Sequence, residues 1–96
     1  MYTVLQSGTF KEWLAGLKDA QARARIIARI RRVELGNLGD TKTVGKGVSE
    51  MRIDYGPGYR LYFSMRDRVL ILLLCGGDKR TQGNDIKRAQ RMVREL

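Results

Sequence analysis

Two arginines on neighbouring strands of an expected hairpin are the first candidates for chemistry in this sequence. Arg52 and Arg60 flank a Gly-Pro-Gly turn at 56–58, within a segment (51–65) in which apolar and polar residues alternate. Because side chains of a strand alternate between its faces, an inward apolar set leaves both guanidinium groups on the outer face. Two arginines on a rigid strand pair can clamp a phosphate. The alternative is the solvated face of an ordinary sheet, where exposed arginines are common.

A second polar cluster follows the most apolar segment of the chain. The run VLILLLC at 69–75 is typical of a strand buried on both faces, and a glycine pair ends it. Directly behind come Asp78, Lys79, Arg80 and Gln82. A polar cluster mounted on the end of a buried strand is a candidate site, because the strand supports it rigidly. We expect Asp78 to orient Lys79 or Arg80, and both Asp78 and Gln82 are candidate RNA contacts.

Together these cations suit metal-independent cleavage of RNA. In that reaction the substrate's own 2′-hydroxyl attacks the phosphate, and fixed cations stabilise the extra negative charge of the transition state. Arg60 is our first choice for this role, with Arg52 and Arg80 in support. Arginine stays protonated, so Lys79 is the candidate acid or base, provided that neighbouring cations lower its pKa. Tyr62 shares the outward parity of Arg60 and is expected to stack on a base.

A glycine-bearing segment at 37–47 carries Lys42 and Lys46, which could pass near the phosphates of a nucleic acid. Its glycines lack the GxxxxGK[ST] spacing of a phosphate-binding loop. We therefore expect a flexible connector, with Lys46 as a candidate RNA contact.

The composition favours a nucleic-acid partner and argues against a metal site. Lysine and arginine total 19 against 10 acidic residues, a formal charge of +9. Such an excess attracts nucleic acid, an acidic membrane or an acidic protein, and no amphipathic terminal helix or lipidation signal points to a membrane. With no histidine and a single cysteine, Cys75, we expect neither a metal nor another cofactor. Without a secretory signal or a membrane-spanning run, we expect a cytoplasmic chain with Cys75 buried and inert.

The elements that must position these residues follow from apolar spacing and helix caps. The 96 residues suffice for one domain with one modest core. In order, we predict a strand at 2–5, a helix at 9–17 with a capping box of Thr9 and Glu12, a helix at 20–35 capped by Asp19, the hairpin at 51–65, a strand at 69–75 and a last helix capped by Thr81 or Asn84. This β-α-α-β-β-β-α order predicts an α+β domain, with two N-terminal helices packed on one face of a small, mostly antiparallel sheet and a C-terminal helix.

The helix at 20–35 is rich in arginine. Its apolar stripe leaves five arginines to cover the other faces: Arg23, Arg25, Arg29, Arg31 and Arg32. Such a series could contact RNA, dock an acidic partner or simply be solvated.

Several motifs, taken together, give a family resemblance that covers nearly the whole chain. They are EMRIDYG at 50–56, GYRLYF at 58–63, LCGGDKRTQ at 74–82 and DIKRA at 85–89. In these motifs and in the order of its elements the chain resembles the RelE/ParE toxin superfamily, most closely its HigB-like branch of addiction module killer proteins. The resemblance implies a single RelE-like domain over 1–96, and the toxin of a type II toxin–antitoxin pair.

Toxins of that kind typically cut mRNA in the ribosomal A site and thereby inhibit translation and growth, so the resemblance implies a metal-independent endoribonuclease (an mRNA interferase). It also implies a cognate antitoxin, usually a helix-turn-helix DNA-binding protein. Carried over by position, the arginine of the GYR motif falls on Arg60, the basic residue of the preceding strand on Arg52, and the basic pair after the last strand on Lys79 and Arg80.

The chain departs from that pattern near its end. Some of these nucleases have a tyrosine or histidine there that assists proton transfer, but residues 81–96 contain neither. A non-catalytic toxin that binds DNA gyrase or another target, as in the ParE branch, is therefore the alternative. A plain RNA-binding module ranks third, because the chain has neither the aromatic spacing of an RRM nor the GXXG loop of a KH domain.

Overall fold

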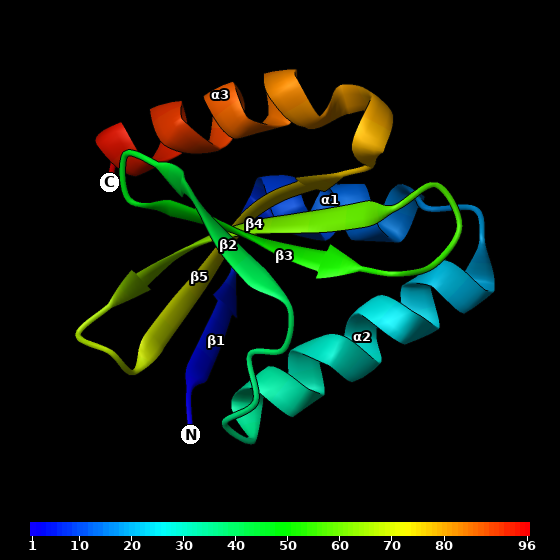
Figure 1. Ribbon diagram of the computed structural model, residues 1–96, viewed down its shortest axis with the longest axis horizontal. Helices are drawn as coiled ribbons and strands as arrows, with labels where there is room; N and C mark the ends of the chain where they lie inside the picture. The colour runs from blue at the N-terminus through cyan, green and yellow to red at the C-terminus, as the bar shows by residue number, and fades with distance from the viewer.

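Five strands form one mixed sheet between two layers of helices in the computed structural model, which describes residues 1–96 (Figure 1). The elements in chain order are β1 (Thr3–Gln6), α1 (Gly8–Gly16), α2 (Ala20–Glu34), β2 (Thr41–Gly45), β3 (Val48–Ile53), β4 (Tyr59–Arg66), β5 (Leu70–Gly77), the 3₁₀ turn η1 (Lys79–Thr81) and α3 (Gln82–Arg94). The sheet order is β1-β5-β4-β3-β2; β1 pairs parallel with β5, and all other pairs are antiparallel. The predicted α+β class with a mostly antiparallel sheet is confirmed.

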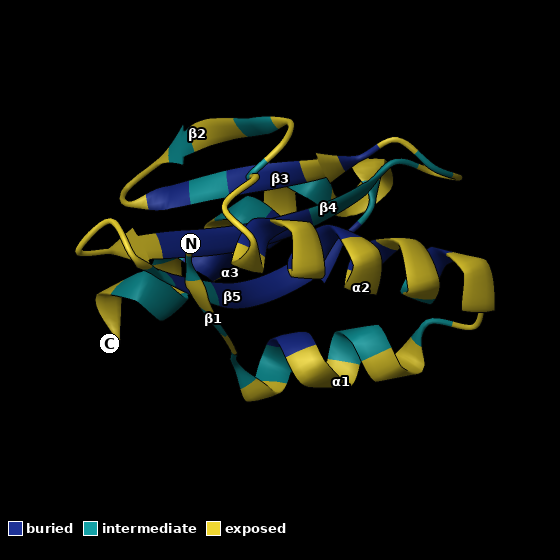
Figure 2. Ribbon diagram, turned by 90° about the horizontal axis from the view of Figure 1, so that it is seen from below, coloured by how far each residue is buried: buried dark blue, intermediate teal, exposed yellow.

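Helices lie on both faces of the sheet. On one face, Phe10 of α1 and Ile26 of α2 pack on Leu61 and its neighbours, which places the two N-terminal helices as predicted. On the other face, Ala89 of α3 packs on Tyr62. Figure 2 shows the buried residues concentrated in the strands between these layers. The second face, which we expected to be open, is therefore covered in part by α3.

The prediction of a flexible connector at 37–47 is wrong for its second half, because β2 forms there as an edge strand. β2 pairs antiparallel with β3, and its register shifts between Thr43 and Gly45. Lys46 and Gly47 make the turn to β3 with φ of 54° and 79°. The sequence signal of β2 is weak because an edge strand with two glycines nearby buries few side chains, whereas its pairing depends on the free backbone edge of β3.

The hairpin of β3 and β4 forms as predicted. Met51 is opposite Leu61, and Arg52 is directly opposite Arg60. Both glycines of the Gly-Pro-Gly turn have positive φ, 58° and 82°, a region that L side chains rarely adopt. The turn therefore fixes the register that aligns the two arginines.

β5 is buried on both faces, as the apolar run predicted, and a bulge changes the direction of its last residues. Tyr62 is opposite Cys75 but Phe63 is opposite Leu73, so Leu74 is the extra residue of the bulge. Leu74 and Cys75 consequently both belong to the core beneath α3. A carbon atom added to Gly76 would point towards α1, and one added to Gly77 would point towards α3 on the other face of the sheet.

The helix caps differ from prediction at α1. Ser7, not Thr9, accepts a hydrogen bond from the backbone N–H of Phe10 at 3.0 Å, and its hydroxyl donates to the carbonyl of Leu74 at 2.6 Å. Asp19 caps α2 as predicted, accepting from the backbone of Gln21 and Ala22. Thr81, one of the two residues predicted to cap the last helix, stands at the N-cap position of α3 but makes no side-chain cap bond there. Asp78 caps the preceding 3₁₀ turn.

Cys75 is completely buried, as predicted, and burial raises the pKa of its thiol to about 11. None of the three helices has the length and apolar character needed to cross a membrane.

Candidate nucleic-acid interface

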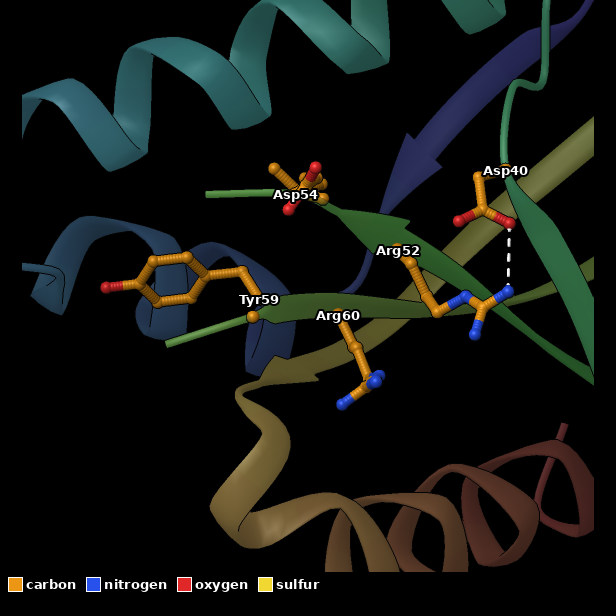
Figure 3. Close-up of a pocket in the computed structure, with 7 residues that line it drawn as sticks. Asp40, Arg52, Asp54, Tyr59 and Arg60 are labelled. Carbon is orange, nitrogen blue, oxygen red and sulfur yellow. Dashed lines mark hydrogen bonds and ion pairs between the residues drawn. The ribbon is translucent and has the colours of Figure 1, made fainter. Parts of the chain in front are cut away.

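A pocket of about 330 Å³ opens where β3 ends and β4 begins. It is lined by Asp40, Arg52, Ile53, Asp54, Gly58, Tyr59 and Arg60. Figure 3 shows the two arginines on adjacent strands, with Asp40 beside Arg52. The strand pairing predicted from sequence thus brings Arg52 and Arg60 into one pocket.

Arg60 forms an ion pair with the buried carboxylate of Glu50. Its side chain is 13% exposed, and its Nε lies 3.6 Å from Oε1 of Glu50, whose side chain is 1% exposed. The other oxygen of Glu50 accepts a hydrogen bond from Nε2 of Gln82 at 2.9 Å. Nε and Nη1 of Arg60 are buried without a hydrogen-bond partner. Arg60 is thus oriented by its ion pair with Glu50. Its buried N–H groups remain without hydrogen-bond acceptors, which costs free energy in the folded protein.

Arg52 is in a different environment. Its side chain is 43% exposed and forms an ion pair with Asp40, with Nη2 3.1 Å from Oδ1. An exposed pair of this kind contributes about 0–1 kcal/mol, so a phosphate can displace Asp40 at small cost.

Lys79 and Arg80 lie next to this pocket but do not line it. Arg60 is opposite Gly77 on β5, and the exposed Lys79 follows in the 3₁₀ turn, close to Gly58. Arg80 lines a neighbouring cavity, and Tyr59 contributes to both. The four predicted cations thus share one end of the sheet: Arg52 and Arg60 line one concavity, Arg80 lines the adjoining one, and Lys79 lies beside Gly58 without lining either.

Asp78 orients Arg80, one of the two options predicted for it. Oδ2 of Asp78 lies 2.9 Å from Nη2 of Arg80, and Oδ1 accepts from the Arg80 backbone at 2.8 Å. The hydrogen bond to the guanidinium lowers the pKa of Asp78 and raises that of Arg80.

The outward position predicted for Tyr62 is wrong. Its side chain is fully buried between the sheet and α3, so a base cannot stack on it without displacing the helix. Burial, followed by the charge of Glu50, raises the pKa of its hydroxyl. Parity along the strand was correct, but the sequence could not show that α3 covers that position.

The structure separates two further candidates from the pocket's surface. Lys46 lies in the turn between β2 and β3, at the opposite end of β3 from Arg52. This turn lies beside the C-terminal end of α3 (Figure 1). Gln82 lies near the pocket, but its amide is bonded to Glu50 beneath Arg60.

Three residues of this region, Glu50, Asp40 and Asp54, had no role in the sequence prediction, and a fourth, Arg29, was expected on an outer face of its helix. Asp54 is exposed, lines the pocket and has no ion-pair partner. Only Arg29 had a usable signal, because its spacing from Ile26, Ile30 and Val33 places it on the buried stripe of α2.

Arg29 is a structural arginine, which corrects its predicted place on an outer face. It donates to the carbonyls of Leu38, Asp40 and Arg52 at 2.7–3.2 Å. Desolvation, followed by the charge of Arg32, lowers its pKa. These bonds tie α2 to the segment before β2 and to the backbone of Arg52 itself, so Arg29 positions one wall of the pocket.

The chain belongs to the phage-derived protein Gp49-like family, whose model matches residues 12–94. A protein of Haemophilus influenzae (strain Rd) is 52% identical over 88 residues, which cover 92% of this chain and 89% of the relative; its name is "Uncharacterized protein". The assignment to the RelE/ParE superfamily is therefore wrong, because the matching family is a different one. Short motifs of glycine, tyrosine and arginine around a hairpin can suit more than one small α+β family.

Proposed function

We propose that this protein is the toxin of a toxin–antitoxin pair and cleaves translated mRNA on the ribosome without a metal ion. The observation that carries the proposal is the pairing of Arg52 with Arg60 in one pocket at the end of the sheet. A guanidinium pair held on adjacent strands matches the fork geometry of phosphate oxygens. The formal charge of +9 supports a polyanionic substrate.

The chemistry assigned to the pocket is attack of a 2′-oxygen on the adjacent phosphorus. The new P–O2′ bond forms while the P–O5′ bond breaks, and the product is a 2′,3′-cyclic phosphate. Arg60 stabilises the pentacoordinate phosphate, because its guanidinium is already oriented against Glu50 and its small exposed part lines the pocket. Arg52 leaves its ion pair with Asp40 and binds a second oxygen of the phosphate that Arg60 holds.

The proton of the 2′-hydroxyl needs an acceptor within the pocket. Asp54 supplies an exposed carboxylate there that no cation of the chain engages. We assign it as the general base, in place of Lys79, which lies outside the pocket lining. Tyr59 or solvent donates a proton to the departing 5′-oxygen. On the ribosome, orientation of the substrate provides much of the rate, so modest acid–base groups suffice.

A toxin of this kind needs a neutralising partner. We propose a cognate antitoxin, a helix-turn-helix DNA-binding protein that is acidic where it meets this surface. The supporting feature is the uneven charge of the chain, since complementary charge speeds association and sets specificity.

The test is to express the chain from a tightly controlled promoter and to map mRNA 5′ ends. Wild-type protein should produce new cuts in translated messages, and Arg52→Gln should reduce their frequency about a hundredfold or more, since one transition-state contact is worth about 2.7–4 kcal/mol. Arg66→Gln is the control, because Arg66 is an exposed arginine at the far end of β4 without an ion pair. Equal cutting by the Arg52 variant would overturn the site.

Arg60 requires a more careful substitution. Arg60→Gln alone leaves Glu50 buried without its cation, which costs about 3–5 kcal/mol and invites unfolding. The double variant Glu50→Gln/Arg60→Gln removes both charges and should remain folded while it loses the cuts. Asp54→Asn, at an exposed position, should also lose them without a change in thermal stability.

A non-catalytic toxin that acts on DNA gyrase is the second candidate. The observation that favours it is that Arg52, Arg60 and Arg80 are each paired with a carboxylate inside the chain. Growth arrest with a DNA-damage response and without new mRNA ends would support this candidate and sink the nuclease.

A further inference from the structure

A second, larger groove continues from the pocket along α2. Its volume is about 590 Å³, and it shares Asp40, Arg52, Ile53 and Asp54 with the first pocket. The rest of its lining comes from α2: Arg25, Ala28, Arg29 and Arg32. A ligand bound at Arg52 can therefore extend towards α2 around the end of β3, past Ile53 and Asp54.

The arginines of this wall lie on one stripe of the helix. Residues 25, 28, 29 and 32 are spaced by three and four, so their side chains project from the same face of α2. Arg29, in the middle, is buried and bonded to backbone carbonyls, which leaves Arg25 and Arg32 to face a ligand. Both are exposed, and neither belongs to any of the three ion pairs of the molecule.

Arg25 is also held in place. Its guanidinium carbon lies 4.5 Å from the ring centre of Tyr55, a cation–π contact. The Tyr55 hydroxyl is in turn within hydrogen-bond distance of Asp19 at 3.1 Å and of Gln21 at 3.2 Å. A side chain supported on an aromatic ring loses less conformational freedom when it binds an anion.

We infer that this groove, formed by α2 and the end of β3, binds the sugar-phosphate backbone of single-stranded RNA as it leaves the Arg52/Arg60 pocket, with phosphates on Arg25 and Arg32. The inference rests on the proposed function for the position of the scissile phosphate. Seven residues of helix place the two arginines about 10 Å apart along the axis, close to three steps of a stacked strand at about 3.4 Å each.

RNA fits this groove better than an acidic protein does. Only two of its eight lining residues are apolar, Ala28 and Ile53, whereas three are exposed arginines that can pair with phosphates: Arg25, Arg32 and Arg52. No aromatic residue lines the groove, and Arg25 lies over one face of the neighbouring Tyr55 ring. The groove therefore contacts the backbone and not the bases, and its binding should depend on length and salt but not on sequence.

The experiment measures binding of fluorescein-labelled 2′-O-methyl RNA, which the proposed reaction cannot cleave. Two lengths are compared, about 4 nucleotides, which fills the pocket alone, and about 12 nucleotides, which reaches α2. The variant is Arg25→Gln/Arg32→Gln, tested across about 50–200 mM salt. The control is Arg91→Gln/Arg94→Gln, which removes the same charge from two exposed arginines near the end of α3.

The groove variant should weaken binding of the longer RNA about tenfold and lower its salt slope by about 1.4, while the shorter RNA binds as before. The control should change either affinity by less than about twofold. Equal weakening by both variants would overturn the inference, because general attraction would then explain the binding. Unchanged RNA affinity, with lost binding of an acidic antitoxin, would also overturn it and assign the groove to protein.

These outcomes are independent of the nuclease test. RNA that binds along the groove without being cut would leave the inference standing and remove the proposed function. If the groove variant still cleaves RNA and its RNA affinity is unchanged, the proposed function stands and the inference about the groove is overturned.

Discussion

At the scale of single residues, two arginines of the same pocket have different physical roles. Arg60 is buried against Glu50, so it is fixed before any ligand arrives, whereas Arg52 is exposed and exchanges partners readily. Preorganised charge favours a transition state, and mobile charge favours capture of a substrate. The buried carboxylate beneath Arg60 explains how a cation with so little solvent contact remains stable in the fold.

Cys75 gives a pH prediction at the same scale. Burial raises the pKa of its thiol from the ordinary 9.0 to about 11, so the folded thiol stays neutral where an unfolded one ionises. The stability from this difference is fully present below pH 9 and is lost as the pH rises to 11, by about 2 kcal/mol.

Chemical denaturation of the wild type and of Cys75→Ala at about pH 8 and about pH 11 checks this expectation. The stability advantage of the wild type should shrink by about 2 kcal/mol at the higher pH. An advantage that does not change with pH would contradict it.

At the scale of elements, two glycines at the end of β5 allow helices to approach both faces of the strand. A methyl group on Gly76 would collide with the ring of Trp13 from α1, and one on Gly77 would collide with the Asp85 carboxylate of α3. That carboxylate accepts a hydrogen bond from the Thr81 hydroxyl at 2.5 Å. The glycine pair, which from sequence only ended a strand, thus determines how closely α1 and α3 pack beside the pocket.

Alanine substitutions test this packing. Gly76→Ala and Gly77→Ala should each destabilise the protein by about 1–3 kcal/mol, because the methyl group forces well-packed neighbours to move. Gly83→Ala is the matched control: no heavy atom lies within 4 Å of its added carbon, and its backbone is helical. It should stabilise by about 0.4–1 kcal/mol.

Thermal unfolding of the three variants decides the matter. If Gly77→Ala were as stable as Gly83→Ala, α3 would not pack against Gly77 of β5 as closely as described here.

At the scale of the whole molecule, charge is the dominant feature. The chain carries 19 basic residues against 10 acidic ones, and the structure contains three ion pairs. Most of its cations therefore have no ion-pair partner in the chain. Their excess positive charge attracts polyanions, but the repulsion among them destabilises the compact state.

Salt should consequently stabilise the free protein. Raising NaCl from about 10 mM to about 150 mM shortens the Debye length from about 30 Å to about 8 Å and screens this repulsion. If about 0.5 kcal/mol is recovered, the melting temperature rises by about 2–4 °C.

A variant with four exposed cations outside the site replaced by glutamine, at Lys11, Lys18, Lys87 and Arg91, should show a smaller rise. A melting temperature that falls with salt in the wild type would mean that ion pairs outweigh repulsion.

Local patterns alone predicted much of this fold. The period of two in β3 and β4 and the Gly-Pro-Gly turn predicted the hairpin and the pairing of Arg52 with Arg60, because register follows from alternation and turn geometry. The cap at Asp19 and the buried strand at β5 were equally local signals. The sequence by itself therefore places the two arginines of the candidate site on neighbouring strands.

Tertiary structure decided what covers each position. Tyr62 has the parity of Arg60 but lies beneath α3, Arg29 turns from a surface cation into an anchor, and β2 exists because β3 offers it an edge. Asp40 joins the site from the segment before β2, whereas Glu50 and Asp54 flank Arg52 along the chain, and only the packing makes one a buried partner of Arg60 and leaves the other exposed. Periodicity fixes the face on which a side chain lies, whereas burial and ion pairing depend on which distant element packs there.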